Sequence, residues 1–488
     1  MASNMQGVIK TNAADLYGEL CDEIRLFLSI RHIEQYREDI GSDGLLVVHE
    51  LIDKGKVWRN ECRAYIDGEQ ISEFASDSYR APEADELEFK KWRKWGAKSA
   101  LYACLEKHFN KKLPWGALTG VRPTKLMRSC TADYGTEHTE RIFKDVFYVS
   151  EEKTDLLRDI CARQKPFLDS LTDRDIDVYI GIPFCTSRCA YCSFLSAVVS
   201  GDGQREQAYV EALLHEMEAL RPVMESYRVR SVYIGGGTPT SLSAELLSKV
   251  AHAAGRLGAK EFTVEAGRPD TITEEKLAAL KAAGVNRISV NAQTTSNHTL
   301  SLIGRSHSAD DFFSAFELAE KFNFDAVNTD LIIGLPTEGE REFEKSLSDV
   351  IALAPDNITV HTLAIKRASK FGMDNETAFA DKDTAERIVA MSADSLSRAG
   401  YDPYYMYRQK YMAGSMENVG YAKPGKECVY NIDIMEEQAS IMAFGAGSIS
   451  KRVRMAEKKI GRAACVKDVS HYLARTDEMA ERKRALFV

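Results

Sequence analysis

The stretch Val178-Tyr-Ile-Gly-Ile-Pro-Phe-Cys-Thr-Ser-Arg-Cys-Ala-Tyr-Cys192 joins a short apolar run to three cysteines. A short apolar run with β-branched residues is typical of a buried strand. Cys185, Cys189 and Cys192 follow it with the spacing C-x3-C-x2-C. Thiolates this close together in the sequence can bind one metal centre. The stretch therefore predicts a buried strand that ends at a metal-binding loop.

Three cysteines leave one ligand position of such a centre open. A structural zinc site normally has a fourth Cys or His, and residues 193–214 contain neither. An iron–sulfur cluster is normally held by four thiolates. Three thiolates therefore indicate a [4Fe-4S] cluster with one iron free to bind another molecule, and zinc or a chance spacing are the alternatives. The other cysteines are interpreted as small buried apolar residues: Cys21, Cys62, Cys104, Cys130, Cys161, Cys428 and Cys465.

The composition argues against several classes of protein. A net charge of -9 disfavours a general nucleic-acid binder, which is normally basic. No stretch approaches the roughly 18 to 20 apolar residues that cross a bilayer, so no membrane span is expected. Residues 1–10 lack the basic start and apolar core of a secretory signal. A cytoplasmic protein with reduced thiols is therefore expected.

Short β-rich runs alternate with helical patterns between residues 177 and 364. This alternation is typical of repeated βα units around a parallel sheet. Strands are predicted at residues 177–182, 231–234, 261–265, 287–291, 326–333 and 357–363, and helices at 204–220, 244–257 and 274–283. A capping box of Thr271 with Glu274 is expected to begin the last of these helices, and Gly284 is expected to end it.

The predicted fold class is α/β, a partial TIM-like (β/α)6 barrel, because six strands close only part of an eight-stranded barrel. A chain of 488 residues is long enough for two or three domains. We predict an N-terminal α+β domain of unassigned role at residues 1–165 and the barrel at residues 171–370. A C-terminal α/β extension that covers the substrate is predicted at residues 375–488. The chemistry is expected at the carboxyl ends of the strands.

Glycines and polar residues follow the predicted strands. Gly235-Gly-Gly-Thr-Pro239 follows the second strand, where glycines let the backbone approach a ligand closely. Further polar residues near the same rim are Glu265, Asn291, Gln293, Arg305 and Asp330. Each alone is explained by a tight turn or a surface charge, but together they predict a site for a polar cosubstrate. His307 is interpreted either as a structural histidine or as a proton donor.

On these residues the chain resembles the radical S-adenosylmethionine (SAM) superfamily, and within it the oxygen-independent coproporphyrinogen III oxidase family. The resemblance is carried by Cys185-x3-Cys189-x2-Cys192, Gly235-Gly-Gly-Thr-Pro-Thr240, Glu265, Gln293, Gly304-Arg-Ser-His307 and Asp330. It covers residues 177–365 and continues through 418–425 and 445–449. Residues 115–125 are similar to the coproporphyrinogen dehydrogenase, or HemZ-like, branch of the family.

The resemblance implies a [4Fe-4S] cluster on the three cysteines and one SAM molecule at its free iron. By analogy, the contacts to this SAM are Tyr179, Gly236, Glu265 and Ile449. The best-known branch of the family holds a second SAM molecule. The positions that match its contacts are Tyr191, Gly237, Thr238, Gln293, Arg305, Asp330 and Ala364.

The implied activity is the anaerobic oxidative decarboxylation of coproporphyrinogen III to protoporphyrinogen IX. It requires a tetrapyrrole substrate and a one-electron donor such as flavodoxin or ferredoxin. Two positions depart from the family pattern: Phe194 stands where the decarboxylating branch has a further cysteine, and Gly181 where the family usually has His. The alternatives are therefore a haem-binding or haem-trafficking protein that retains the cluster, and a radical enzyme that opens or alkylates the haem ring.

A short basic segment is the candidate site for the substrate carboxylates. Arg122, Lys125 and Arg128 lie within seven residues beside a loop rich in Gly and Pro. A planar guanidinium suits a propionate better than a flexible ammonium does. The alternative interpretation is an ordinary solvated basic segment or a contact between domains.

Overall fold

The structure is a computed structural model that forms two compact units, residues 1–158 and residues 159–488. It describes residues 5–28, 30, 32–37, 44–55, 57–79, 86–194, 196–364, 369, 371, 382–409, 416–457 and 459–488. The boundary predicted between the barrel and the C-terminal extension falls on residues 370 and 372–375, which lie outside the described residues. That part of the domain prediction stays a prediction.

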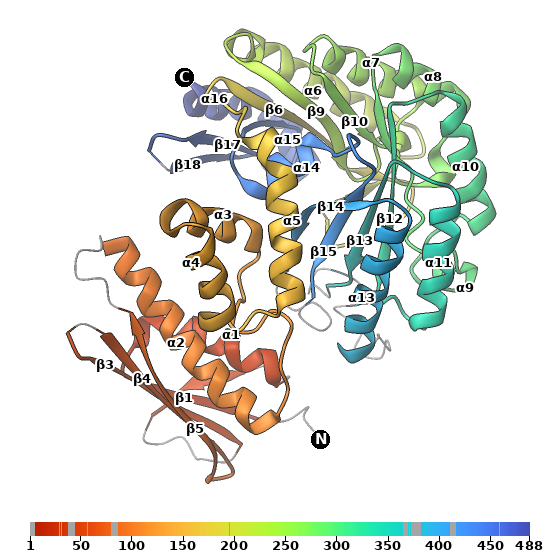
Figure 1. The fold of residues 1–488 in the computed structure, drawn as a ribbon. Helices are drawn as coiled ribbons and strands as arrows, with labels where there is room; N and C mark the ends of the chain where they lie inside the picture. The colour runs from red at the N-terminus through yellow and green to blue at the C-terminus, as the bar shows by residue number, and fades with distance from the viewer. Residues whose placement is uncertain are drawn as a thin grey trace. The chain divides into compact units, whose positions relative to one another are not determined.

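Unit 2 is built on a sheet of 11 strands, whose centre is six parallel strands arranged in sequence order (Figure 1). These strands are β6 (Asp175–Ile182), β9 (Arg228–Gly236), β10 (Glu261–Glu265), β11 (Arg287–Ser289), β12 (Ala326–Ile333) and β13 (Asn357–Thr362). Parallel neighbours need crossover connections, and helices supply them. The predicted α/β class with a partial (β/α)6 barrel is confirmed.

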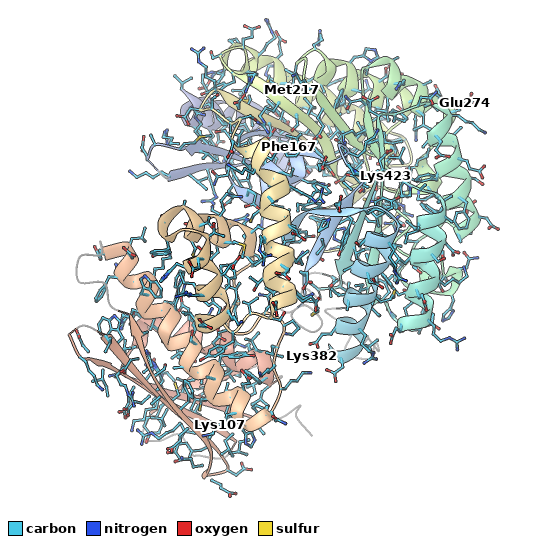
Figure 2. All side chains as sticks on the ribbon, viewed as in Figure 1. Lys107, Phe167, Met217, Glu274, Lys382 and Lys423 are labelled. Carbon is cyan, nitrogen blue, oxygen red and sulfur yellow. The ribbon has the colours of Figure 1, made fainter. Side chains whose placement is uncertain are left out.

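The crossover helices cover the outer face of the curved sheet (Figure 1). They are α6 (Gln204–Met224), α7 (Ala244–Gly255), α8 (Glu274–Ala282), α9 (Asn297–Leu302), α10 (Ala309–Lys321) and α11 (Glu340–Ala352). Val178, Ile180 and Ile182 share one face of β6 and are fully buried, as expected where crossover helices cover that face of a parallel sheet. Glu274, at the start of α8, lies on the exposed outer surface (Figure 2).

The predicted capping box of Thr271 with Glu274 is wrong. Helix α8 does begin at Glu274, but its N-cap is Thr273, whose hydroxyl oxygen accepts a hydrogen bond from the Lys276 N–H at 3.3 Å. Thr271 instead ends a short 3-10 turn, η4 (Pro269–Thr271), and its hydroxyl donates to the Arg268 carbonyl at 2.7 Å. Pro269 begins a separate turn that includes Thr271, so the N-cap of α8 is Thr273, two residues later than predicted. Gly284 follows the helix with a φ of 87°, as predicted.

The sheet continues beyond both ends of the parallel core. Next to β13 lie β15 (Asn418–Ala422) and β14 (Asp402–Tyr407), both in antiparallel pairings. Next to β6 lies β16 (Ser440–Phe444) in a parallel pairing, followed by the antiparallel strands β17 (Ile449–Arg454) and β18 (Lys459–Ala464). The accompanying helices are α13 (Lys382–Arg398), α14 (Val429–Glu436), α15 (Val469–Ala474) and α16 (Thr476–Phe487). Strands β14 to β18 therefore complete the barrel sheet.

A buried glutamate joins the C-terminal helices to α6. Glu216 of α6 is fully buried and forms an ion pair with Lys483 of α16, whose side chain is also buried. The second carboxylate oxygen of Glu216 accepts hydrogen bonds from the Tyr472 hydroxyl at 2.8 Å and from the Gly445 N–H at 3.1 Å. These bonds fix α15, α16 and the end of β16 against one side of the barrel.

Unit 1 contains a separate five-stranded sheet in the order β2-β1-β3-β4-β5. Its strands are β1 (Gly7–Thr11), β2 (Ile33–Gln35), β3 (Leu45–Asp53), β4 (Val57–Ile66) and β5 (Glu69–Tyr79). Two helices, α1 (Tyr17–Phe27) and α2 (Glu86–Phe109), bury an apolar core against it. Smaller helices follow: α3 (Pro123–Tyr134), α4 (Thr136–Arg141) and η2 (Ile142–Val146). Helix α5 (Glu151–Leu168) contains the boundary between the units.

An aromatic cluster stabilises unit 1 around α2. Trp92 and Trp95 pack edge to face with ring centroids 5.0 Å apart, and Trp95 packs in the same way on Phe147 at 4.9 Å. Both indoles are buried. Edge-to-face pairs of this kind add stability beyond the area they bury.

No helix in the described part of the chain is long and apolar enough to cross a membrane.

Candidate functional site

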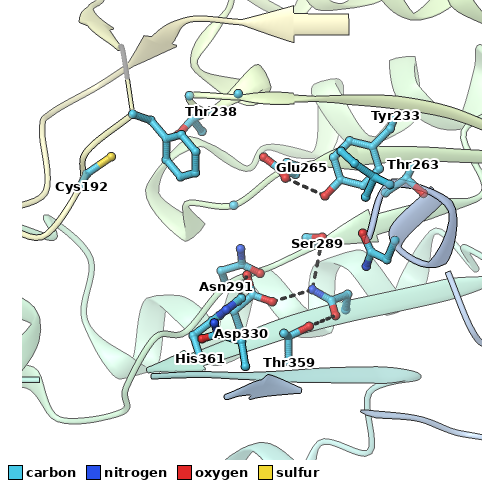
Figure 3. A pocket seen from close by; sticks show the side chains of 18 of the residues that line it. Cys192, Tyr233, Thr238, Thr263, Glu265, Ser289, Asn291, Asp330, Thr359 and His361 are labelled. Atoms are coloured by element: carbon cyan, nitrogen blue, oxygen red, sulfur yellow. Dashed lines mark hydrogen bonds and ion pairs between the residues drawn. The ribbon is translucent and has the colours of Figure 1, made fainter. Parts of the chain in front are cut away.

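A cavity of about 710 Å³ lies inside the barrel of unit 2 and reaches the carboxyl ends of its parallel strands. Its lining also includes the first residues of three strands, Arg287, Ala326 and Asn357. Figure 3 shows Glu265 and Tyr233 on one side of it and Asn291, Asp330 and His361 on the other. Its lining includes all the residues that the sequence assigned to the cluster or to SAM: Tyr179, Cys185, Cys189, Tyr191, Cys192, Gly236, Gly237, Thr238, Glu265, Gln293, Arg305, Asp330, Ala364 and Ile449. Residues up to 270 positions apart in the sequence thus share one cavity.

The three cysteines form one wall of the cavity. Cys185 ends β7 (Phe184–Cys185), which pairs with β8 (Ala197–Val198) and closes the loop at its base. The Thr238 hydroxyl donates to the Cys185 sulfur at 3.5 Å. Burial raises the pKa of the Cys192 thiol, and the nearby Cys189 and Cys185 raise it further.

Within the described residues, no three His, Cys, Asp or Glu side chains converge closely enough to hold one metal ion. The three cysteines nonetheless line one cavity. In an iron–sulfur cluster each cysteine binds a different iron.

The glycine run after β9 lets the backbone pass close to the cysteine loop. A Cβ on Gly237 would lie 2.4 Å from the Phe184 carbonyl oxygen and 3.0 Å from the Cys185 sulfur. Gly236 has a φ of 110°, a conformation that side chains rarely adopt. Gly237 is therefore required because a side chain would collide with the cysteine loop, and Gly236 is required because of its backbone conformation.

Glu265, at the end of β10, is a buried carboxyl with a raised pKa. Burial raises its pKa to about 7, the Tyr233 hydroxyl bond opposes the rise, and the negative charge of Asp330 reinforces it. The Tyr233 hydroxyl donates to the carboxylate at 2.6 Å. The ring of Tyr233 in turn stacks on Tyr430, with centroids 4.4 Å apart. Tyrosines thus hold Glu265 in one orientation, facing the cavity.

Gln293 and Arg305 approach the cavity from the segment between β11 and β12, and Asp330 approaches it from β12. Asp330 accepts a hydrogen bond from the Asn328 amide at 2.9 Å, and its other oxygen lies 3.7 Å from Nε2 of His361. Arg305 donates to the Gly267 carbonyl at 3.0 Å and to the Tyr191 hydroxyl at 3.2 Å. Both charged groups are therefore held in place by neighbouring polar atoms.

Gln293 has a strained backbone and an unused polar atom. Its φ of 65° is unusual for a residue with a side chain, and a backbone bond to Asp330 at 2.8 Å maintains it. The buried oxygens Gln293 Oε1, Asn291 Oδ1 and Thr263 Oγ1 find no hydrogen-bond partner among the described residues. Buried polar atoms in native proteins are normally satisfied, so these three indicate a polar ligand or ordered water in the cavity.

The remaining candidates lie elsewhere. The His307 side chain is fully buried, with Nδ1 3.7 Å from an oxygen of Asp270, and is not part of the cavity lining. Arg122, Lys125 and Arg128 belong to unit 1, beside and within the first turns of α3. The cavity lining comes entirely from unit 2. A role for these three basic residues in substrate binding therefore stays a proposal.

Sequence reasoning missed several residues of this region. His361 and Tyr233 line the cavity, but nothing in their local sequence distinguishes them from ordinary strand residues. Arg268 also lines the cavity and is only 3% exposed. Arg268 lies three residues after the end of β10, a position where polar residues of a site often lie. That position could have identified it from the sequence.

Comparison with known proteins identifies the superfamily and the family of the chain. The profile of the Radical SAM superfamily matches residues 179–350. The chain is 37% identical to the oxygen-independent coproporphyrinogen-III oxidase-like protein HemZ of Bacillus subtilis over 390 residues, 78% of each chain. It is 31% identical to the heme chaperone HemW of Bacillus subtilis over 275 residues, which are 55% of this chain and 69% of HemW.

Among solved structures, coproporphyrinogen III oxidase (HemN) from Escherichia coli superposes with a TM-score of 0.52 at 22% identity. The match covers 66% of this chain and 73% of HemN. The fold is that of a radical SAM protein. The chain belongs to the family of oxygen-independent coproporphyrinogen-III oxidase-like proteins, which includes HemZ.

Proposed function

We propose that this protein is an anaerobic radical SAM enzyme that converts coproporphyrinogen III to protoporphyrinogen IX. The observation that carries the proposal is the convergence of the three cysteines, the glycine run and the buried polar residues on one cavity. Similarity to HemZ over most of both chains supports the tetrapyrrole substrate. A cytoplasmic location and an external one-electron donor of the flavodoxin or ferredoxin type belong to the same proposal.

Cys185, Cys189 and Cys192 would hold a [4Fe-4S] cluster and leave one iron open. When bound, the cluster supplies the electron that cleaves the sulfonium bond of SAM into methionine and a 5′-deoxyadenosyl radical. Tyr179, Gly236, Glu265 and Ile449 would hold this SAM. The positive sulfonium and ammonium groups of SAM suit the Glu265 carboxylate in particular.

A second SAM molecule would be held by Tyr191, Gly237, Thr238, Gln293, Arg305, Asp330 and Ala364. Arg305 can offer a guanidinium to a carboxylate, and Asp330 can accept from an ammonium or a ribose hydroxyl. The unpartnered Gln293 oxygen adds an acceptor beside them. The site therefore offers both signs of charge to a zwitterionic ligand.

In the proposed reaction a hydrogen atom leaves the β-carbon of a propionate side chain. Loss of carbon dioxide and of one electron to a one-electron acceptor then gives the vinyl group, and the sequence occurs once at each of two propionates. A reactive radical requires that water be kept away from it during the reaction. The basic segment at Arg122, Lys125 and Arg128 is the proposed reader of the substrate carboxylates.

A second candidate function is haem binding without decarboxylation. HemW, a heme chaperone, is 31% identical to this chain over 275 residues. Phe194, in place of the extra cysteine of the decarboxylating branch, lines the cavity and is 67% exposed. An exposed aromatic ring at this position suits stacking on a flat porphyrin.

The deciding experiment is an anaerobic assay of the reconstituted protein with coproporphyrinogen III, SAM and a chemical reductant. We expect loss of two carbon dioxide molecules in the product mass, together with 5′-deoxyadenosine. Cys185→Ala should abolish the cluster absorbance and both products. The control is Cys161→Ala, which removes another half-exposed thiol outside the loop and should change neither. Tight haem binding with no product from coproporphyrinogen would favour the chaperone function instead.

A further inference from the structure

Arg268 places a buried positive charge beside the cysteine loop. It follows β10 in the segment Ala266-Gly-Arg-Pro-Asp270, and its side chain is 3% exposed. Its Nη1 lies 4.0 Å from the Cys189 sulfur. At that distance the contact acts through the charge of the guanidinium more than through a strong hydrogen bond.

The guanidinium is fixed on both sides. On the side of the cysteine loop, Nη1 donates to the Ser187 carbonyl at 3.2 Å and to the Ser187 hydroxyl at 2.8 Å. On the side of η4, Nε and Nη2 donate to the two carboxylate oxygens of Asp270 at 3.1 and 3.2 Å. A planar group held by this many bonds keeps its charge at one place.

Arg268 and Asp270 bring charges of opposite sign to the cysteine loop. A cluster on three thiolates becomes more negative when it accepts an electron, and a nearby positive charge stabilises that reduced state. The Asp270 carboxylate partly cancels the positive charge. Hydrogen bonds to the sulfurs and nearby charge are recognised determinants of cluster potential.

Arg305 is a second buried guanidinium whose charge reaches Cys189. Its hydrogen bonds go to the Gly267 carbonyl and to the hydroxyl of Tyr191, which stands between Cys189 and Cys192 in the same loop. Arg268 differs in that it bonds both polar oxygens of Ser187 and brings Nη1 to 4.0 Å from the Cys189 sulfur itself.

We propose that Arg268 sets the reduction potential of the cluster, with Asp270 as its opposing charge. The inference rests on the proposed function, because it requires that the three cysteines carry a cluster. Arg268 acts as a positioning residue: it favours acceptance of one electron from the external donor without contacting the substrate. Because Asp270 partly cancels the charge of Arg268, the reduction potential is raised less than an unpaired guanidinium would raise it.

The test is an anaerobic redox titration of the reconstituted protein, with the reduced cluster followed by electron paramagnetic resonance. Arg268→Gln removes the charge and keeps an amide of similar reach. We expect the equilibrium constant for reduction to fall about tenfold, which for one electron is a potential about 59 mV more negative. Asp270→Asn should move the potential in the opposite direction, because the guanidinium loses its counter-charge. Arg268→Lys should fall between wild type and Arg268→Gln.

The matched control is Arg228→Gln, since Arg228 also pairs with an aspartate, Asp175, but at the start of β9, the opposite end of that strand from the glycine run. Its potential should equal that of wild type. Equal potentials in wild type and Arg268→Gln with intact clusters would overturn the inference. If Arg268→Gln fails to assemble a cluster, the Asp270→Asn arm decides, and an unchanged or more negative potential there overturns it. Absence of a cluster in wild type would instead overturn the proposed function.

Discussion

Glu265 changes its charge near neutral pH, and this gives the site a testable dependence on acidity. Its pKa is about 7 because the carboxyl is buried and lies near Asp330. The group is therefore neutral below that pH and negative above it. A ligand with net positive charge, such as SAM, should bind the negative form more tightly.

We predict that SAM affinity rises about tenfold between pH 6 and pH 8, in proportion to the ionised fraction of Glu265. Glu265→Gln should remove this part of the pH dependence and bind SAM weakly at both values. Calorimetric titration of the reconstituted protein measures both. If the glutamine variant shows the same rise with pH as wild type, another group is responsible.

At the scale of single elements, the turn after β9 decides whether the cysteine loop can close. A Cβ at Gly237 would collide with the Phe184 carbonyl oxygen and press on the Cys185 sulfur. The backbone cannot move away easily, because the Gly237 and Thr238 N–H groups donate to the carbonyls of Ile182 and Phe184 at 2.8 and 2.7 Å.

We predict that Gly237→Ala destabilises the protein by about 1–3 kcal/mol and lowers the amount of cluster that the protein retains. Chemical denaturation and iron content measure the two effects. Gly201→Ala is the control, because an added Cβ there meets nothing within 4 Å. Normal iron content in Gly237→Ala would mean that the loop can shift to make room.

The strands were predictable from the sequence because their pattern is local. The predictions of residues 261–265 and 326–333 match β10 and β12. The strand predicted to end at residue 291 ends at Ser289, and the chain rejoins the sheet only through one bridge between Gln293 and Leu331. That irregularity depends on the neighbouring strand, so no local pattern could reveal it.

Placement of the polar residues around one cavity was predictable from the βα alternation, because parallel strands end at the same rim. The partners of those residues were not. The bond from Tyr233 to Glu265 joins residues 32 positions apart, and the contact of Arg268 with Cys189 spans 79. Such pairs are defined by the packing of the sheet, which one sequence does not specify.

At the scale of the whole molecule, the buried pair of Glu216 and Lys483 closes the barrel unit. Both side chains are at most 1% exposed. We predict that Lys483→Met costs about 3–5 kcal/mol, because it leaves a buried carboxylate without its counter-charge. Urea denaturation followed by circular dichroism measures the loss.

Two further variants check the cause. Glu216→Gln combined with Lys483→Met should be less destabilising than Lys483→Met alone. Lys249→Met, which breaks the exposed pair with Glu245, should cost less than about 1 kcal/mol. A double variant as unstable as the single one would mean that packing, not charge, dominates at Lys483.

Unit 1 has a proposed role in reading the substrate carboxylates. We predict that Arg122→Gln raises the coproporphyrin concentration for half-saturation about tenfold, the loss expected for one charge-assisted hydrogen bond. SAM cleavage without substrate should be unchanged. Arg141→Gln, an exposed arginine of the same unit paired with Glu137, is the control. Equal coproporphyrin and haem binding by Arg122→Gln and wild type would assign the segment another role.

The aromatic cluster around α2 has a practical consequence for spectroscopy. The chain has four tryptophans, Trp58, Trp92, Trp95 and Trp115, and all of them belong to unit 1. Intrinsic tryptophan fluorescence therefore reports on unit 1 alone, while the visible absorption of a reconstituted cluster would report on unit 2. Heating one sample while both signals are recorded can thus distinguish melting of the two units without any label.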